Sequence, residues 1–126
     1  LAIMSKHLNC GIEFNLYEKS YHKSEFLKEV SKKLDLSVNI IQEDVFKNKF
    51  SEKGTIVARA FKPLPVVLDL INKNFKNYKN IILFMGSSGK KILNDSFREW
   101  DFNYEYKKSF TSKESFLLNI KKIKKK

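Results

Sequence analysis

Apolar residues along this chain change their spacing several times between the period of a strand and the period of a helix. Residues 12–17 alternate apolar and polar side chains, which is typical of a strand. After Glu18 the apolar residues recur every three or four positions up to Leu34, which predicts a helix with one apolar face. The same patterns predict a helix end at 1–8, strands at 37–41, 55–58, 81–85, 102–106 and 116–120, and helices starting near Pro63 and after Gly89.

Predicted strands and helices alternate along most of the chain. This order is typical of an α/β sheet with helices on both faces. Residues 81–85 are apolar without alternation, so we expect a strand that is buried on both faces in the middle of a parallel sheet. The last two predicted strands flank the polar segment 111–114, so we expect them to form an antiparallel pair that closes the sheet.

Length and composition favour one folded domain. The 126 residues suit a single domain, and a hydrophobic fraction of 42% is enough for a packed core. No apolar run approaches the roughly 20 residues of a membrane-spanning helix. Cys10 is the only cysteine, which excludes a disulfide-rich secreted domain. The chain opens on Leu1 without a charged leader or a cleavage site, so we expect it to be the interior of a longer protein.

Lysine gives the chain a strong positive charge. The 25 Lys and Arg residues outnumber the 14 Asp and Glu residues, which leaves a net charge of +11, and only Arg59 and Arg98 are arginines. This excess favours a polyanionic partner, nucleic acid above all. A genome that favours lysine codons would give the same composition. Residues 121–126 are predicted to be a disordered, lysine-rich tail that displaces counterions from RNA without reading its bases.

Three predicted strands end in residues that suit a ligand, because ligands of α/β sheets bind beyond the carboxyl ends of the strands. Glu18 follows the first predicted strand, and its two carboxylate oxygens can accept both hydroxyls of a ribose. Alternatively, Glu18 is a solvated charge that favours the start of the next helix. Arg59 follows a short apolar strand, and its planar, always-charged guanidinium suggests a specific contact. Alternatively, Arg59 is an ordinary surface residue. Gly86 ends the apolar strand 81–85, and either terminates it or allows a ligand to approach closely.

Several familiar catalytic patterns are missing from the sequence. Residues 86–91 resemble a phosphate-binding loop only superficially, because the four-residue spacer and the hydroxyl residue after the lysine are absent. His7, His22 and Cys10 lack the spacing of metal ligands. No glycine-rich loop lies between a predicted strand and a predicted helix, although a dinucleotide or adenosyl site in this fold requires one.

Three segments resemble the RsmG (GidB) family of small-subunit rRNA methyltransferases. Residues 18–27 resemble the segment after the second strand of that family, where an acidic residue is followed by a basic pair and Phe-Leu. Residues 58–64, Ala-Arg-Ala-Phe-Lys-Pro-Leu, resemble the family's Ser-Arg-Ala-x-x-x-Leu motif after the fourth strand. Residues 114–120, just before the lysine-rich end, resemble the closing strand. The resemblance covers the whole chain, as the C-terminal part of the methyltransferase domain, residues 1–126 with the tail 121–126.

This resemblance implies a class I, Rossmann-like fold that lacks its first strand and its glycine-rich loop. It also implies S-adenosylmethionine (SAM) as the cofactor and methyl transfer to N7 of a guanine in 16S rRNA, within the small ribosomal subunit. N7 carries a free lone pair, so no catalytic base is expected, and the task is to hold N7 about 3–3.5 Å from the methyl group. The implied cofactor-binding residues are Glu18, Asp44, Val45 and Arg59, and the implied substrate-binding residues are Arg59, Lys62 and Gly86. We expect a cytoplasmic monomer that binds neither a metal nor a membrane, and whose residues 1–126 are inactive alone.

The chain departs from the family at three places. The glycine-rich loop and the N-terminal helices are absent, residues 43–46 replace an Arg-small-Glu pattern, and Met85-Gly86 replaces Lys-Gly. Two other functions therefore stay open. One is a non-catalytic, basic RNA-binding protein of the ribosome, and the other is a nicotinamide-dependent enzyme, for which Glu18 is equally suitable. A Gly-x-Gly-x-Gly loop upstream would favour the methyltransferase, Gly-x-Gly-x-x-Gly the dehydrogenase, and no glycine loop the RNA-binding protein.

Overall fold

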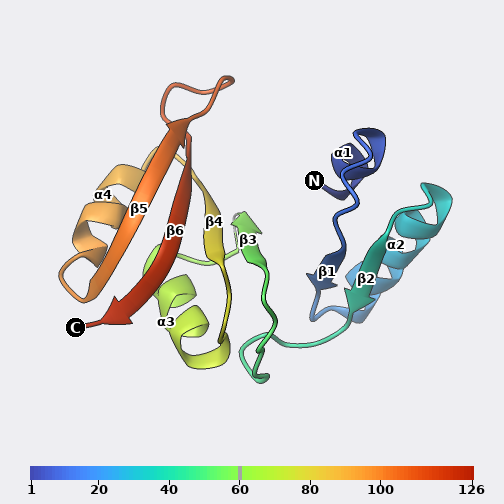
Figure 1. Ribbon diagram of the computed structural model, residues 1–126, viewed down its shortest axis with the longest axis horizontal. Coiled ribbons are helices and arrows are strands. Elements are labelled where there is room, and N and C mark those ends of the chain that lie inside the picture. The colour runs from blue at the N-terminus through green and yellow to red at the C-terminus, as the bar shows by residue number, and fades with distance from the viewer. Residues whose placement is uncertain (60) are drawn as a thin grey trace. The chain divides into compact units, whose positions relative to one another are not determined.

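The computed structural model describes residues 1–59 and 61–126, which form two compact units, Leu1–Asn48 and Lys49–Lys126 (Figure 1). The first unit contains α1 (Ala2–His7), β1 (Phe14–Tyr17), α2 (Tyr21–Lys33) and β2 (Val38–Ile41). β1 and β2 pair in parallel, with Phe14 opposite Val38 and Tyr17 opposite Ile41. Every element predicted in this segment is confirmed, with its ends shifted by a few residues.

The second unit contains one mixed sheet and two helices. Its elements are β3 (Thr55–Arg59), α3 (Leu64–Asn74), β4 (Asn80–Met85), α4 (Gly89–Ser96), β5 (Trp100–Lys108) and β6 (Phe116–Lys125). The strand order is β3-β4-β6-β5. β3 and β4 are parallel, whereas β6 runs antiparallel to both β4 and β5. The predicted closing antiparallel pair is therefore confirmed as β5 and β6.

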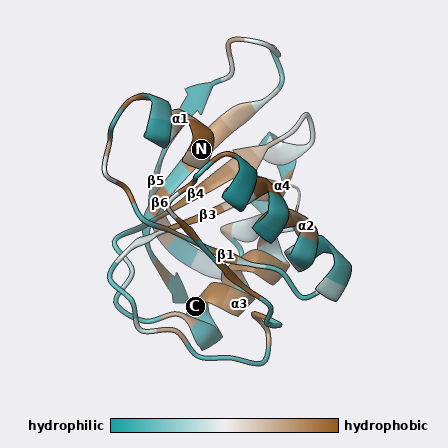
Figure 2. Ribbon diagram, turned by 90° about the vertical axis from the view of Figure 1, so that its right-hand side faces the viewer, coloured by the Kyte–Doolittle hydropathy of each residue, from teal (hydrophilic) through white to brown (hydrophobic). Residues whose placement is uncertain are grey.

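The hydrophobic core of the second unit lies on one face of this sheet. α3 and α4 both pack there, against alternate residues of β4, β5 and β6. Ile81 and Leu83 of β4 lie opposite Ile120 and Leu118 of β6, and all four side chains are buried. α3 is mostly hydrophobic in colour and α2 mostly hydrophilic in Figure 2. The buried residues of the cluster are Leu64, Val67, Leu68, Ile71, Ile81, Leu83, Leu93, Trp100, Phe102, Phe116, Leu118, Ile120 and Ile123.

The strand predicted at residues 81–85 is confirmed as β4, but the prediction that it is buried on both faces within a parallel sheet is wrong. β4 is an internal strand, yet only its β3 neighbour is parallel to it. Its second face is not fully buried, because the Phe84 side chain is 38% exposed and lies on the opposite face from Leu83. An unbroken apolar run therefore marks an internal strand here without implying cover on both faces.

The prediction of a disordered tail over residues 121–126 is wrong, because β6 continues to Lys125 and pairs with β5. Lys125 lies opposite Trp100, and its Nζ is 3.1 Å from an Asp69 carboxylate oxygen and 5.4 Å from the Trp100 ring centroid. Lys126 Nζ donates a hydrogen bond to the Phe97 carbonyl at 2.6 Å. The end of the chain is thus held against α3 and the α4–β5 turn.

Gly89 packs more tightly than the other glycines of the chain. A Cβ at this position would lie 2.8 Å from Met85 Cβ and 2.9 Å from Phe116 Cε1, whereas a Cβ at Gly86 would meet nothing within 4 Å. Gly89→Ala is expected to lower the free energy of unfolding by about 1–3 kcal/mol through overpacking. Gly89 is the first residue of α4, so the roughly 1 kcal/mol that alanine gains over glycine in a helix interior offsets this cost only in part. Urea unfolding measures the change, with Gly86→Ala as the matched control, and equal midpoints for the two variants would contradict the expectation.

Candidate functional site

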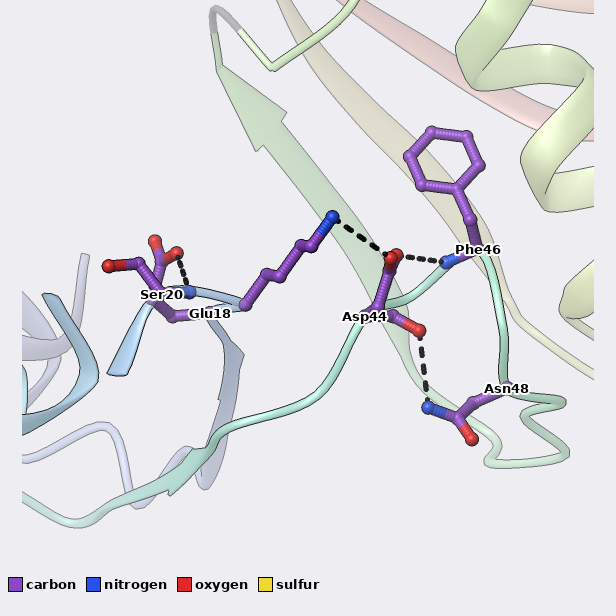
Figure 3. Close-up of polar contacts among 6 residues, drawn as sticks. Glu18, Ser20, Asp44, Phe46 and Asn48 are labelled. Atoms are coloured by element: carbon purple, nitrogen blue, oxygen red, sulfur yellow. Dashed lines mark hydrogen bonds and ion pairs between the residues drawn. The ribbon is translucent and has the colours of Figure 1, made fainter. Parts of the chain in front are cut away.

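The carboxyl ends of β1 and β2 bring two acidic residues to the same edge of the first unit. Glu18 directly follows β1, and Asp44 lies three residues beyond the end of β2. Because the two strands are parallel and in register, both side chains leave the sheet at its carboxyl edge (Figure 3). Val45, the third residue expected in this region, is half-buried beside Asp44. The first unit thus contains Glu18, Asp44 and Val45, three of the four residues expected to bind the cofactor.

The backbone around Glu18 is fixed on both sides. The Glu18 N–H donates to the Ile41 carbonyl at 3.0 Å, which extends the pairing of β1 with β2 by one residue. Glu18 Oε1 accepts a hydrogen bond from the Ser20 N–H at 2.8 Å. Ser20 is also the N-cap of α2, since its side chain accepts a hydrogen bond from the Lys23 N–H. The half-buried carboxylate is therefore held at the junction of strand and helix, and its lone pairs can accept further hydrogen bonds.

Asp44 organises the turn that follows β2. Its Oδ1 accepts a hydrogen bond from the Phe46 N–H at 3.0 Å, and its backbone carbonyl accepts bonds from the Lys47 N–H and from Asn48 Nδ2 (Figure 3). The Lys19 ammonium lies 3.4 Å from Asp44 Oδ2, while the aspartate side chain is 18% exposed. The Phe46 N–H, followed by Lys19, holds the pKa of Asp44 below its usual value of 3.8. Asp44 is therefore an anionic anchor of this turn at neutral pH.

The arrangement of Glu18 and Asp44 is suited to binding a neutral ligand with hydroxyl groups. An ionised carboxylate only accepts hydrogen bonds, and a ribose offers hydroxyl donors. The ion pair of Lys19 with Asp44 links the β1–α2 turn to the turn that follows β2. The half-buried Val45 adds an apolar surface next to these polar groups. This edge therefore combines hydrogen-bond acceptors with an apolar surface.

The second unit carries the residues expected to contact the substrate, at the carboxyl ends of its two parallel strands. Lys62 and Gly86 line a cavity of about 150 Å³ between the β3–α3 and β4–α4 connections. Arg59 is the last residue of β3, and its guanidinium lies 5.9 Å from the ring centroid of Phe84, which also lines the cavity. Space around Gly86 is open, so this position leaves room for a ligand. Ala60, part of the Arg59 motif, lies outside the described residues.

Sequence patterns alone assigned no role to Lys19, Ser20 or Phe84. Ser20 had a usable signal, since serine before an amphipathic helix is a common N-cap. Lys19 and Asp44 are 25 residues apart, and only the parallel pairing of β1 with β2 brings them together. Phe84 belongs to an apolar strand whose two faces cannot be distinguished without the rest of the sheet.

Three further observations limit the chemistry of the described part of the chain. Within residues 1–59 and 61–126, no three His, Cys, Asp or Glu side chains come together as a metal site. Across the same ranges, no helix is both long and apolar enough to cross a membrane. Cys10 is exposed and carries a free thiol.

Comparisons with known proteins give a consistent picture. The family model described as GidB, rRNA small subunit methyltransferase G, matches residues 1–120. Over all 126 residues the chain is 54% identical to Ribosomal RNA small subunit methyltransferase G of Pelagibacter ubique (strain HTCC1062), and it covers 59% of that protein. It is 23% identical over 120 residues to the protein of that name from Dinoroseobacter shibae, of which it covers 62%. The chain thus spans about three-fifths of the length of these curated relatives.

Solved structures show the same fold at low sequence identity. The chain superposes on the 23S rRNA methyltransferase ErmE with a TM-score of 0.57 and 8% identity, covering 87% of this chain and 52% of that one. For a putative rRNA-methylase from Clostridium thermocellum, the TM-score is 0.56 at 10% identity, with 90% of this chain and 74% of that one covered. These neighbours and the mixed sheet confirm the predicted α/β, class I methyltransferase fold in truncated form.

Proposed function

The chain belongs to the GidB family, rRNA small subunit methyltransferase G, and on this basis we propose that it takes part in SAM-dependent methylation of 16S rRNA at N7 of a guanine. Residues 1–126 would form the C-terminal part of the methyltransferase domain. The partner would be the small ribosomal subunit, and the enzyme would act in the cytoplasm as a monomer. The family supports rRNA methylation, and the site supports the choice of cofactor.

The observation that carries the proposal is that Glu18 and Asp44 follow parallel β1 and β2 at the same carboxyl edge, where the Ser20 N–H holds the Glu18 carboxylate and Lys19 pairs with Asp44. Glu18 would accept hydrogen bonds from the ribose hydroxyls of SAM. Asp44 and Val45 would border the adenine. Arg59, at the end of β3, would lie at the edge of the cofactor or of the RNA.

The proposed reaction makes modest demands on the protein. SAM, when bound, supplies an electrophilic methyl group on its sulfonium sulfur. N7 of guanine has a free lone pair, so no side chain needs to remove a proton from it. The residues of this chain would therefore bind and orient the two reactants, which is a large part of catalysis for such a transfer. Lys62 and Gly86, which line the cavity beyond β3 and β4, would receive the guanine nucleotide.

A calorimetric titration distinguishes this proposal from its two alternatives. The protein to test is a chimera in which residues 1–126 replace the matching segment of the Pelagibacter ubique relative, which is 54% identical. We expect the chimera to bind SAM and not NAD. Binding of NAD in preference to SAM would favour a dehydrogenase. Binding of neither, with RNA binding retained, would favour the non-catalytic RNA-binding protein that the net charge of +11 also suits.

Exposed lysines of β6 are expected to contribute to RNA affinity through charge alone. Lys121, Lys122 and Lys124 are exposed, whereas Lys125 pairs with Asp69 and is left in place. Replacing the three exposed lysines with glutamine should make the plot of log binding constant against log salt concentration less steep. Its slope should fall in magnitude by about 0.7–0.9 for each lost phosphate contact. The loss should be similar for 16S rRNA and an unrelated RNA, since phosphate contacts carry no sequence information. Filter binding of the chimera at several salt concentrations measures it, and unchanged slopes would make these lysines ordinary solvated charge.

A further inference from the structure

The turn between β5 and β6, residues 109–115, presents an aromatic ring to solvent. Phe110 is 96% exposed, more than any other large hydrophobic residue in the described part of the chain. The Lys107 ammonium, at the end of β5, lies 5.7 Å from the centroid of the Phe110 ring. The ring thus makes no contribution to the core, and its exposed face has a positive charge beside it.

Hydrogen bonds within the turn hold its shape. The Ser109 N–H donates to the Ser115 carbonyl at 2.9 Å, which closes the hairpin below the turn. The Thr111 N–H donates to Ser109 Oγ at 3.3 Å, and Ser115 Oγ donates to Ser112 Oγ at 3.2 Å. Phe110 is therefore presented from a structured turn, and less conformational freedom is lost when a partner binds it.

The charges around Phe110 fit a phosphate backbone. Lys107, Lys108 and Lys113 are exposed in and beside the turn, where Glu114 is the one acidic residue between positions 107 and 115. An aromatic ring with flanking lysines is the combination that binds single-stranded nucleic acid, because a base stacks on the ring while cations neutralise the neighbouring phosphates. Bases of a duplex are already stacked on one another, whereas unpaired bases of an RNA loop are free to stack on a side chain.

We propose that the β5–β6 turn is a single-stranded RNA contact, in which Phe110 stacks on an unpaired base and Lys107, Lys108 and Lys113 neutralise the flanking phosphates. The choice of RNA as the polyanion rests on the proposed function. This contact lies at the tip of the β5–β6 hairpin, so it does not depend on the residues assigned to SAM or to the methylated guanine. It would select substrate regions that expose an unpaired base.

Phe110→Ala tests the stacking interaction in the full chain. A fluorescein-labelled 12-nucleotide oligouridylate is the probe, with a duplex RNA of equal length beside it. We expect Phe110→Ala to weaken binding of the single strand by roughly 5- to 150-fold, without a change in salt dependence. Phe110→Trp should retain the affinity and show fluorescence quenching by RNA, since the native Trp100 is buried. Phe26→Ala is the matched control, because Phe26 is 64% exposed on α2 and is expected to leave the affinity unchanged.

A pair of lysine substitutions tests the charge contribution. The double substitution Lys108→Gln with Lys113→Gln should reduce the slope of log binding constant against log salt concentration by about 1.4 in magnitude. This value assumes that each lysine neutralises one phosphate of a single strand. The control removes the same charge from α2 through Lys23→Gln with Lys32→Gln, and should have a much smaller effect. Equal changes in the two double variants would overturn the proposal, because binding would then depend on net charge alone.

Two other results would also overturn this inference. One is equal RNA affinity of the Phe110→Ala and Phe26→Ala variants. The other is loss of binding to phosphatidylglycerol vesicles in Phe110→Ala with RNA binding intact, which would make the turn a membrane contact. Failure of the proposed function has a different signature. In that case the chimera transfers no methyl group, yet the effect of Phe110→Ala on RNA binding remains.

Discussion

Glu18→Ala is expected to weaken SAM binding by the chimera by about 1–3 kcal/mol, which corresponds to roughly 5- to 150-fold in the dissociation constant. The reason is the loss of a half-buried carboxylate whose oxygens would accept the ribose hydroxyls. The fold should persist, because the Ser20 side chain that caps α2 and the pairing of β1 with β2 do not involve the Glu18 carboxylate. Isothermal titration calorimetry measures the affinity, and thermal unfolding checks the fold.

Glu13→Ala is the matched control for this substitution. Glu13 precedes β1 at its opposite end, where its carboxylate accepts a hydrogen bond from Asn39 Nδ2 at 2.9 Å. The Glu13→Ala substitution removes the same charge from the same unit and leaves the carboxyl edge unchanged. If the two alanine variants bind SAM with equal affinity, Glu18 is a solvated charge at the start of α2 and has no role in the cofactor site.

Residues 1–126 alone are expected to bind SAM at least about tenfold more weakly than the chimera. Their glycines are at positions 11, 54, 86 and 89, so they contain no glycine-rich loop. Among the described residues, β1 pairs with β2 alone and β3 lies at the end of its sheet, so each has an edge with which a further strand could pair. We propose that a glycine-rich loop, which the family resemblance implies for the full-length enzyme, supplies hydrogen bonds to the charged cofactor. Loss of even one such bond gives a tenfold or larger effect.

Calorimetry of the two proteins under the same conditions tests this expectation. The thermal unfolding midpoint of residues 1–126 is recorded beside it, so that weak binding is not confused with absence of the fold. Micromolar affinity of residues 1–126 for SAM would contradict the proposal that a glycine-rich segment completes the site.

Local patterns were sufficient to place the elements of the fold, because the helices and strands other than β4 have an apolar face with its own period, and β4 is an unbroken apolar run. The end of β6 was missed for an identifiable reason. Between Ile120 and Ile123, β6 holds two residues where β5 holds only Asn103, so a bulge interrupts the alternation. Lys121 and Lys122 consequently look like the start of a charged tail, although Ile123 returns to the core beside Phe102. Pairing with β5, which the sequence of β6 does not encode locally, extends the strand to Lys125.

The candidate site was predictable in position and less so in its contacts. The rule for carboxyl ends of parallel strands was enough to single out Glu18, whereas Asp44 was named only from the family resemblance; the structure places both at one edge. Their partners were not predictable, since the Lys19–Asp44 ion pair depends on the register between β1 and β2. The tight packing of Gly89 depends in the same way on Phe116, a residue 27 positions later in the chain.

Transfer of a tritium-labelled methyl group from SAM to 16S rRNA by the chimera tests the central claim most directly. Small ribosomal subunits from a strain without the endogenous enzyme are the substrate, and the unmodified Pelagibacter ubique relative is the reference protein. We predict label in a single guanine, with strand cleavage at that position after borohydride and aniline treatment, which is specific to N7-methylguanine. A folded chimera that binds SAM but incorporates no label above a reaction without protein would contradict the account.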